Sequence, residues 1–162
     1  MPGSGKSFIG KQLAESLDFS FIDPDKILEQ SHGKPLQQVL ETLGEEMFLH
    51  AEEELSVASL EKVDRTVLAT GGSIVYSHEA METLSRLSSI IYLKVDLETL
   101  QHRTGNIPRG VIGLKNKSYK QLFEERSLLY EKWAAITING SQSPNLVIGD
   151  MLKALYPKTT SV

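Results

Sequence analysis

The sequence predicts a three-layer α/β/α fold in which helices cover both faces of a mostly parallel β-sheet. Two observations support this. Predicted strands alternate with predicted helices along the chain, and the strands 65–70 and 89–95 are continuous apolar runs. Continuous apolar runs are typical of strands that are buried on both faces. The chain has 162 residues. Since a domain typically holds about 150 residues, we predict a single domain over 1–162.

The first half of the chain is expected to begin with a helix. Ile9, Leu13 and Leu17 recur every four residues, which places them on one face of a helix over 8–17. Similar arguments predict the next elements in order: an aromatic-rich strand at 19–23, a helix at 26–30, and a long helix at 36–62 that is interrupted near Gly44.

The second half contains residues that favour helix starts. Ser77 and Asp96 are suitable N-caps, and Pro144 is favoured at the first position of a helix. The expected elements are strands at 65–70, 89–95 and 135–138, and helices at 77–87, 96–103, 118–133 and 144–155.

Composition excludes several classes of protein. The 21 acidic and 17 basic residues give a net charge of −4, which argues against a nucleic-acid partner. The absence of cysteine excludes a disulfide scaffold, a Cys-ligated zinc site and a Cys nucleophile. No signal-peptide pattern and no apolar run of about 20 residues is present. We therefore expect a cytoplasmic protein with no membrane partner. We also expect a monomer.

A phosphate-binding motif precedes the first helix. Gly3, Ser4, Gly5, Lys6 and Ser7 match the C-terminal part of the P-loop pattern G-x-x-x-x-G-K-[ST]. In this motif backbone N–H groups cradle phosphate, the lysine bridges the β- and γ-phosphates, and the hydroxyl binds Mg²⁺. The motif predicts ATP and Mg²⁺ as ligands. The alternative is a glycine-rich turn before a surface helix.

The first glycine of the P-loop pattern and the strand before it would lie ahead of Met1. In P-loop folds that strand is in the middle of the sheet, so its two neighbours are expected to lack a pairing partner. We expect the working protein to begin roughly ten residues upstream, one strand plus the glycine. The alternative is a short form that is unstable or inactive.

Two carboxylates end the strand at 19–23. Asp23 and Asp25 lie where α/β sheets bind ligands, at the carboxyl end of a strand. One can approach Mg²⁺ while the other accepts a hydrogen bond from a substrate hydroxyl. The alternative is a strand-end turn with a helix cap, for which Asp and Pro are also favoured.

Further candidates lie in later loops. Gly71 and Gly72 follow the strand at 65–70, where missing side chains let a ligand come close to the backbone. The irregular segment 104–117 carries Arg109 and is predicted to form a lid over the phosphates. The alternatives are a plain turn and solvated surface arginines.

Together these motifs resemble the shikimate kinase family of P-loop kinases, over nearly the whole chain. The matching residues are the loop 3–7, Phe21-Ile22-Asp23-Pro24-Asp25, Gly44-Glu45-x-x-Phe48-x-x-x-Glu52, Gly71-Gly72, Arg109, and Glu125-Arg126-x-x-Leu129-Tyr130.

The resemblance implies roles for residues on both sides of the reaction. For ATP and metal, it implies phosphate binding by Lys6, metal binding by Ser7 and Asp23, a lid arginine at Arg109, and contacts that flank adenine from Arg103 and Pro144. For the acceptor, it implies that Asp25 binds hydroxyls and acts as base, that Gly71 and Gly72 line the pocket, and that Arg126 binds a carboxylate.

The function implied by the resemblance is phosphoryl transfer from ATP to a hydroxyl of shikimate. Two positions differ from the family pattern: Leu49 stands where the family has arginine, and Ser73 replaces a third glycine. These differences favour two alternatives, a kinase for another small hydroxy acid or polyol, and a nucleotide-binding module without turnover.

Overall fold

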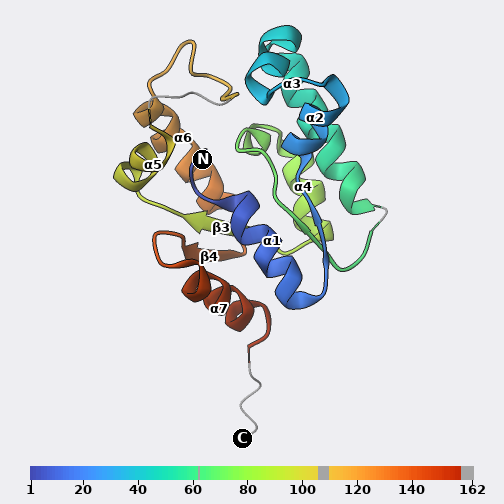
Figure 1. The fold of residues 1–162 in the computed structure, drawn as a ribbon, viewed down its shortest axis with the longest axis vertical. Helices are drawn as coiled ribbons and strands as arrows, with labels where there is room; N and C mark the ends of the chain where they lie inside the picture. Colours follow the sequence, from blue (N-terminus) through green and yellow to red (C-terminus); the bar gives the residue numbers. More distant parts are fainter. Residues whose placement is uncertain (62, 106–109, 158–162) are drawn as a thin grey trace, which may run out of the picture.

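The structure, a computed structural model, describes residues 1–61, 63–105 and 110–157. In these ranges the chain forms four short strands among seven α-helices (Figure 1). The strands are β1 (Ser20–Ile22), β2 (Thr66–Leu68), β3 (Ile91–Lys94) and β4 (Ile136–Asn139). The helices are α1 (Lys6–Leu17), α2 (Pro24–His32), α3 (Leu36–Glu61), α4 (His78–Leu87), α5 (Leu97–Thr104), α6 (Tyr119–Trp133) and α7 (Pro144–Leu155), with a 3₁₀ helix η1 (Ile74–Tyr76).

The strands are parallel, as predicted, and form two separate pairs. β1 pairs with β2, with Phe21 opposite Val67, and β3 pairs with β4, with Leu93 opposite Ile138. Among the residues that the structure describes, no hydrogen-bonded ladder joins the two pairs. The sheet is thus divided between β2 and β3.

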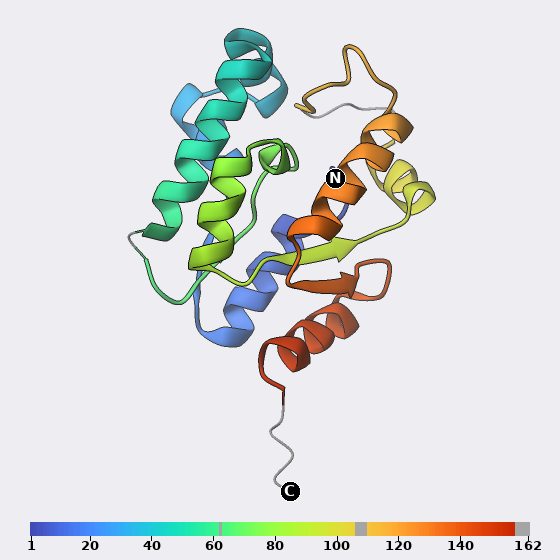
Figure 2. The same cartoon turned by 180° about the vertical axis from the view of Figure 1, so that it is seen from behind.

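Apolar clusters cover both faces of the strands and give the predicted three layers. On one face Leu93 and Ile138 pack with residues of α1 and α7. On the other face Leu68 packs with η1, α4 and α6. Figure 1 shows α1 on the viewer's side of β3, and Figure 2, from behind, shows α4 and α6 on the opposite side.

Local signals set the helix boundaries. Ser77 caps α4 by accepting a hydrogen bond from the Ala80 amide, and Asp96 caps α5 in the same way. The long third helix bends at Gly44, whose φ of 79° is outside the helical range. The predicted strands 65–70 and 89–95 are too long, because pairing limits them to three and four residues. The η1 turn was not predicted.

A helical lobe formed by α2 and α3 also contacts the end of the predicted lid. Ile112 packs into the apolar cluster of this lobe. The Gly110 amide donates to Gln37 Oε1 at 2.8 Å, and the Gly113 amide donates to Glu45 Oε1 at 3.1 Å. These bonds attach the chain after residue 109 to α3. Within the described ranges no helix is both long and apolar enough to cross a membrane.

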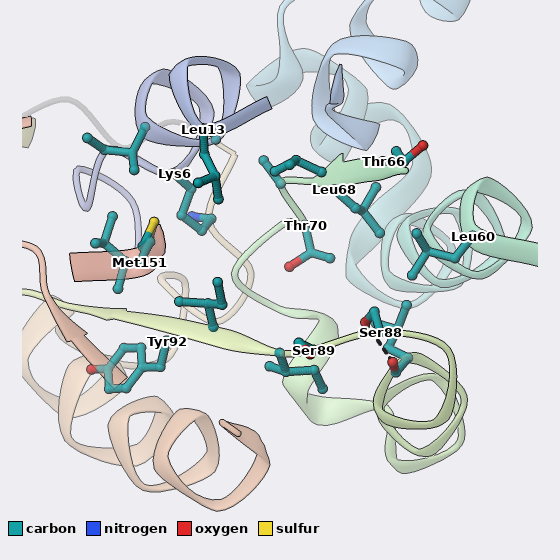
Figure 3. Close-up of a pocket in the computed structure, with 18 of the residues that line it drawn as sticks. Lys6, Leu13, Leu60, Thr66, Leu68, Thr70, Ser88, Ser89, Tyr92 and Met151 are labelled. Atoms are coloured by element: carbon teal, nitrogen blue, oxygen red, sulfur yellow. Dashed lines mark hydrogen bonds between the residues drawn. The ribbon is translucent and has the colours of Figure 1, made fainter. Parts of the chain in front are cut away.

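A cavity of about 440 Å³ separates the two strand pairs. Figure 3 shows β2, with Leu68, and β3, with Tyr92, on opposite sides of it, while Lys6 of α1 lies to the left of β2 in this view. Met1 also lines this cavity and is 5% exposed. Burial lowers the pKa of the Met1 ammonium well below its ordinary value, and the nearby Lys6 and Arg126 lower it further.

An apolar five-residue segment fused ahead of Met1 is expected to stabilise the protein. The segment would pair with β2 and β3, fill the cavity and replace a buried ammonium by a peptide group. Each buried valine or isoleucine contributes about 1.5–3 kcal/mol, against about 1–2 kcal/mol for ordering each residue. We expect the Tm to rise by roughly 5–10 °C in thermal unfolding. An extension of the same length made of serine and glycine is the control. An equal rise in Tm with both extensions would contradict the interpretation that the cavity between β2 and β3 accepts an added strand.

Candidate active site

The loop before α1 has the backbone that a phosphate-binding loop requires. Gly3 and Gly5 have φ values of 78° and 89°, which side-chain-bearing residues rarely adopt. A Cβ on Gly3 would lie 2.7 Å from the Thr104 methyl group, so the loop also packs closely against the end of α5. Within the described chain, α1 has neither a side-chain cap nor an acidic residue in its first turn. Its N–H groups are therefore available to an anion.

Lys6 begins α1 and lies among carboxylates. Its Nζ donates to the Met1 carbonyl oxygen at 3.4 Å. Burial lowers the pKa of Lys6, while the negative charges of Asp25, Asp23 and Glu52 raise it in opposition. The ammonium is thus partly desolvated and lies near the carboxylates of Asp23, Asp25 and Glu52. Ser7, the next residue, is exposed.

The paired carboxylates follow β1, as predicted. Asp23 is buried and caps α2, its Oδ1 accepting from the Lys26 amide at 3.4 Å, with Pro24 at the first helical position. Asp23 therefore caps α2, and its metal binding stays a prediction. Asp25 is in the first turn of α2, and among the described residues its buried Oδ1 has no hydrogen-bond partner. A buried acceptor of this kind is costly unless a ligand satisfies it.

The two glycines after β2 bring the backbone against Asp25 and Arg126. A Cβ on Gly71 would lie 3.1 Å from Asp25 Oδ1, and a Cβ on Gly72 would lie 3.3 Å from Arg126 Nη1. Arg126 is 1% exposed, and it donates from Nη2 to the Ile112 carbonyl at 2.8 Å and from Nε to the Tyr76 hydroxyl at 3.2 Å. The structure thus assembles Asp25, Gly71, Gly72 and Arg126 beside Lys6.

Tyr130 of α6 connects the Gly71-Gly72 turn to the first residue of the chain. Its hydroxyl donates to the Gly72 carbonyl at 2.8 Å and accepts from the Met1 ammonium at 3.1 Å. Burial raises the pKa of Tyr130, so the hydroxyl keeps its proton. The sequence signal for its position is the spacing of four from Arg126, which places both on one face of α6.

Arg103 and Pro144 lie at the corner that joins β4 to α7. The Arg103 guanidinium donates to the Gly140 carbonyl at 3.4 and 3.5 Å, and Pro144 begins α7. Both side chains are exposed. Arg109, the predicted lid arginine, lies outside the described residues.

The family model described as shikimate kinase matches residues 2–156. The chain belongs to the shikimate kinase family. It is 36% identical over 152 residues to the shikimate kinase of Mycobacterium avium, covering 91% of this chain and 85% of that one. It is 34% identical over 150 residues to the shikimate kinase of Francisella tularensis subsp. novicida, covering 90% and 85%. The predicted family and enzyme class, an ATP-dependent phosphotransferase with an alcohol acceptor, are confirmed.

Solved structures of shikimate kinases share this fold. The Acinetobacter baumannii enzyme in complex with shikimate has a TM-score of 0.85 at 26% identity, over 99% of this chain and 92% of that one. The Aquifex aeolicus enzyme has a TM-score of 0.80 at 28% identity, over 99% and 94%. The predicted P-loop kinase fold is therefore confirmed.

The residues predicted to bind Mg²⁺ carry the kind of oxygen donors that this ion prefers. Within the described ranges, no group of three or more acidic or histidine side chains is arranged to hold a metal. Ser7 and Asp23 supply one hydroxyl and one carboxylate, both hard oxygen donors. Mg²⁺ typically keeps several waters and binds one or two protein oxygens plus substrate phosphates. Such a donor set is suited to an ion that arrives with the nucleotide.

Gly71→Ala is expected to damage the acceptor side. The added methyl group would lie 1.7 Å from Glu52 Oε1, so the carboxyl groups of the site would have to move. Because displacements of this size misplace reacting groups, we expect kcat/KM for the acceptor to fall about 100-fold in steady-state assays. Gly149→Ala is the matched control, since a Cβ there meets nothing within 4 Å. Equal activity of the two variants would contradict the described packing.

Proposed function

We propose that this protein transfers the γ-phosphate of ATP to a hydroxyl of shikimate. The observation that carries the proposal is the convergence of an unpartnered carboxylate oxygen of Asp25 and a buried guanidinium of Arg126 on Gly71-Gly72. A hydroxylated carboxylate can satisfy both groups at once. Family membership supports the same acceptor.

On the donor side, the amides at the start of α1 and the Lys6 ammonium would bind the phosphates. Lys6 would neutralise charge on the transferred group, since phosphoryl transfer depends mostly on positioning and electrostatics. Ser7 and Asp23 would hold Mg²⁺, which when bound neutralises phosphate charge. Arg103 and Pro144 flank the region proposed for adenine, at the β4–α7 corner.

On the acceptor side, Asp25 would accept a hydrogen bond from the reacting hydroxyl and take up its proton as transfer proceeds. Arg126 would bind the acceptor carboxylate through Nη1, since its other nitrogens already donate to Ile112 and Tyr76. The hydroxyl oxygen then forms a bond to the γ-phosphorus while the bond to the leaving ADP breaks. Proximity of this kind supplies much of the rate enhancement.

We also propose a single domain over 1–162, with segment 104–117 as a lid that brings Arg109 to the phosphates. The contacts of Gly110 and Gly113 with α3 support a lid anchored at its C-terminal side. The monomeric state and the cytoplasmic location stay predictions.

An acceptor panel tests the proposed function. The protein is incubated with Mg·ATP and shikimate, a second cyclic hydroxy acid, or a polyol, and the products are identified by mass spectrometry. We expect a phosphorylated product with shikimate and much less with the others. Phosphorylation of another compound instead would replace the proposed acceptor, and nucleotide binding with no product in any mixture would favour a module without turnover.

A further inference from the structure

Glu52 is a buried carboxyl group that the mechanism above does not use. It is 2% exposed and comes from the middle of α3. The hydroxyl of Ser73, itself 4% exposed, donates to Glu52 Oε2. No ion pair among the described residues includes Glu52. A buried carboxylate without a salt bridge is strongly disfavoured, so burial favours the neutral acid.

Glu52 and Asp25 approach the same point above Gly71. A Cβ built on that glycine would lie 1.7 Å from Glu52 Oε1 and 3.1 Å from Asp25 Oδ1. Two ionised carboxylates so close together repel each other, and one of them retains a proton. Burial, followed by the charge of Asp25, raises the pKa of Glu52 to about 8. The charge of Lys6 opposes the effect of burial on Asp25.

The charged groups around Glu52 come from several packed elements. Asp25 of α2 favours its neutral form, while Arg126 of α6 and Lys6 of α1 favour its anion. From η1, which also packs on α3, the Tyr76 hydroxyl accepts from Arg126. The titratable side chains of α4 are exposed to solvent: His78, Glu79, Glu82 and Arg86.

We propose that Glu52 is a positioning residue that carries a proton at neutral pH and donates it to Asp25, with Ser73 holding the Glu52 carboxyl in place. This inference rests on the proposed function. The donated hydrogen bond would fix the rotamer of Asp25, and Oδ1, which has two lone pairs, could still accept a hydrogen bond from the acceptor hydroxyl. A neutral Glu52 would also leave the acceptor pocket with one fewer negative charge, which favours binding of an anionic acceptor.

Loss of the Glu52 proton at alkaline pH is expected to weaken acceptor binding. Above pH of about 8 the new anion would repel both Asp25 and the acceptor carboxylate. The KM for shikimate should then rise more steeply than kcat falls. Because the Ser73 hydrogen bond favours the Glu52 anion, Ser73→Ala should move the midpoint of this rise to higher pH.

The test combines two variants of Glu52 with a direct titration. Glu52→Gln keeps a neutral hydrogen-bond donor, so kcat/KM at pH 7 should stay within about ten-fold of the wild type, while Glu52→Ala should lose about 100-fold. Both variants lack the titrating carboxyl group, so both should lose the alkaline rise in KM, and only Glu52→Ala should also lose activity at pH 7. Glu46→Gln, an exposed change on the same helix, is the control. In the wild-type protein, carboxyl ¹³C NMR should show Glu52 titrating near pH 8.

Each failure has its own signature. A Glu52 that titrates near the ordinary pKa of glutamate, or a Glu52→Gln variant as inactive as Glu52→Ala, would overturn the inference while leaving the kinase function intact. A wild-type protein without shikimate-dependent turnover would overturn the proposed function. In that case the NMR titration still decides whether Glu52 holds the proton.

Discussion

Replacing Lys6 by alanine is expected to lower kcat by about 10³-fold or more. Lys6 is the cation at the start of α1, and its Nζ lies among Asp23, Asp25 and Glu52. The Lys6 ammonium can stay in contact with the γ-phosphate while it moves from donor to acceptor. This contact stabilises the negative charge on the transferred group most strongly in the transition state. The loss should therefore appear mainly in kcat, measured by coupled ADP release at saturating substrates.

The fold is expected to survive this change. Burial lowers the pKa of Lys6, so the ammonium is less favourable in the folded chain than in water. Lys11→Ala, an exposed lysine on the same helix, is the matched control and should keep full activity. A Lys6→Ala variant that retains kcat within ten-fold while folded would contradict the assignment of the phosphate site.

Replacing Asp25 by asparagine is expected to lower kcat by about 10²–10⁴-fold. Asparagine keeps the size of the side chain but can neither take up the hydroxyl proton nor carry negative charge. Because Asp25 contacts Gly71 and is not one of the groups proposed to bind the phosphates, the Kd for ATP should change little. Separate measurement of ATP binding by calorimetry and of turnover by ADP release checks both parts.

Asp18→Asn serves as the control for this variant. Asp18 is exposed at the C-terminus of α1 with a φ of 54°, a conformation that asparagine tolerates well. Equal losses of ATP affinity and turnover in Asp25→Asn would contradict the acceptor role of Asp25.

Local chemistry explains why much of the fold was predictable from the sequence. The start of α7 at Pro144 and the caps of α4 and α5 depend on residues within one turn, so the sequence contains all that determines them. The bend at Gly44 has the same origin, because a φ of 79° requires a residue without a Cβ. The loop 3–7 was predictable because glycine, lysine and serine at this fixed spacing form a phosphate-binding motif.

Long-range packing explains what the sequence did not show. The lengths of β2 and β3 depend on their partner strands. The η1 turn forms where the chain contacts Arg126, which donates a hydrogen bond to the Tyr76 hydroxyl. Glu52 is the first of three consecutive glutamates, which suggests a solvated helix face. Its spacing of four from Phe48 and Ser56, which are both buried, is the sequence signal that could have indicated the burial of Glu52.

Steady-state release of ADP from Mg·ATP, with and without shikimate, tests the central claim most directly. We predict release that depends on shikimate, saturates with it, and disappears in Lys6→Ala. A trace that is unchanged by shikimate, in protein shown by calorimetry to bind ATP, would contradict the assignment of this chain as a shikimate-phosphorylating enzyme.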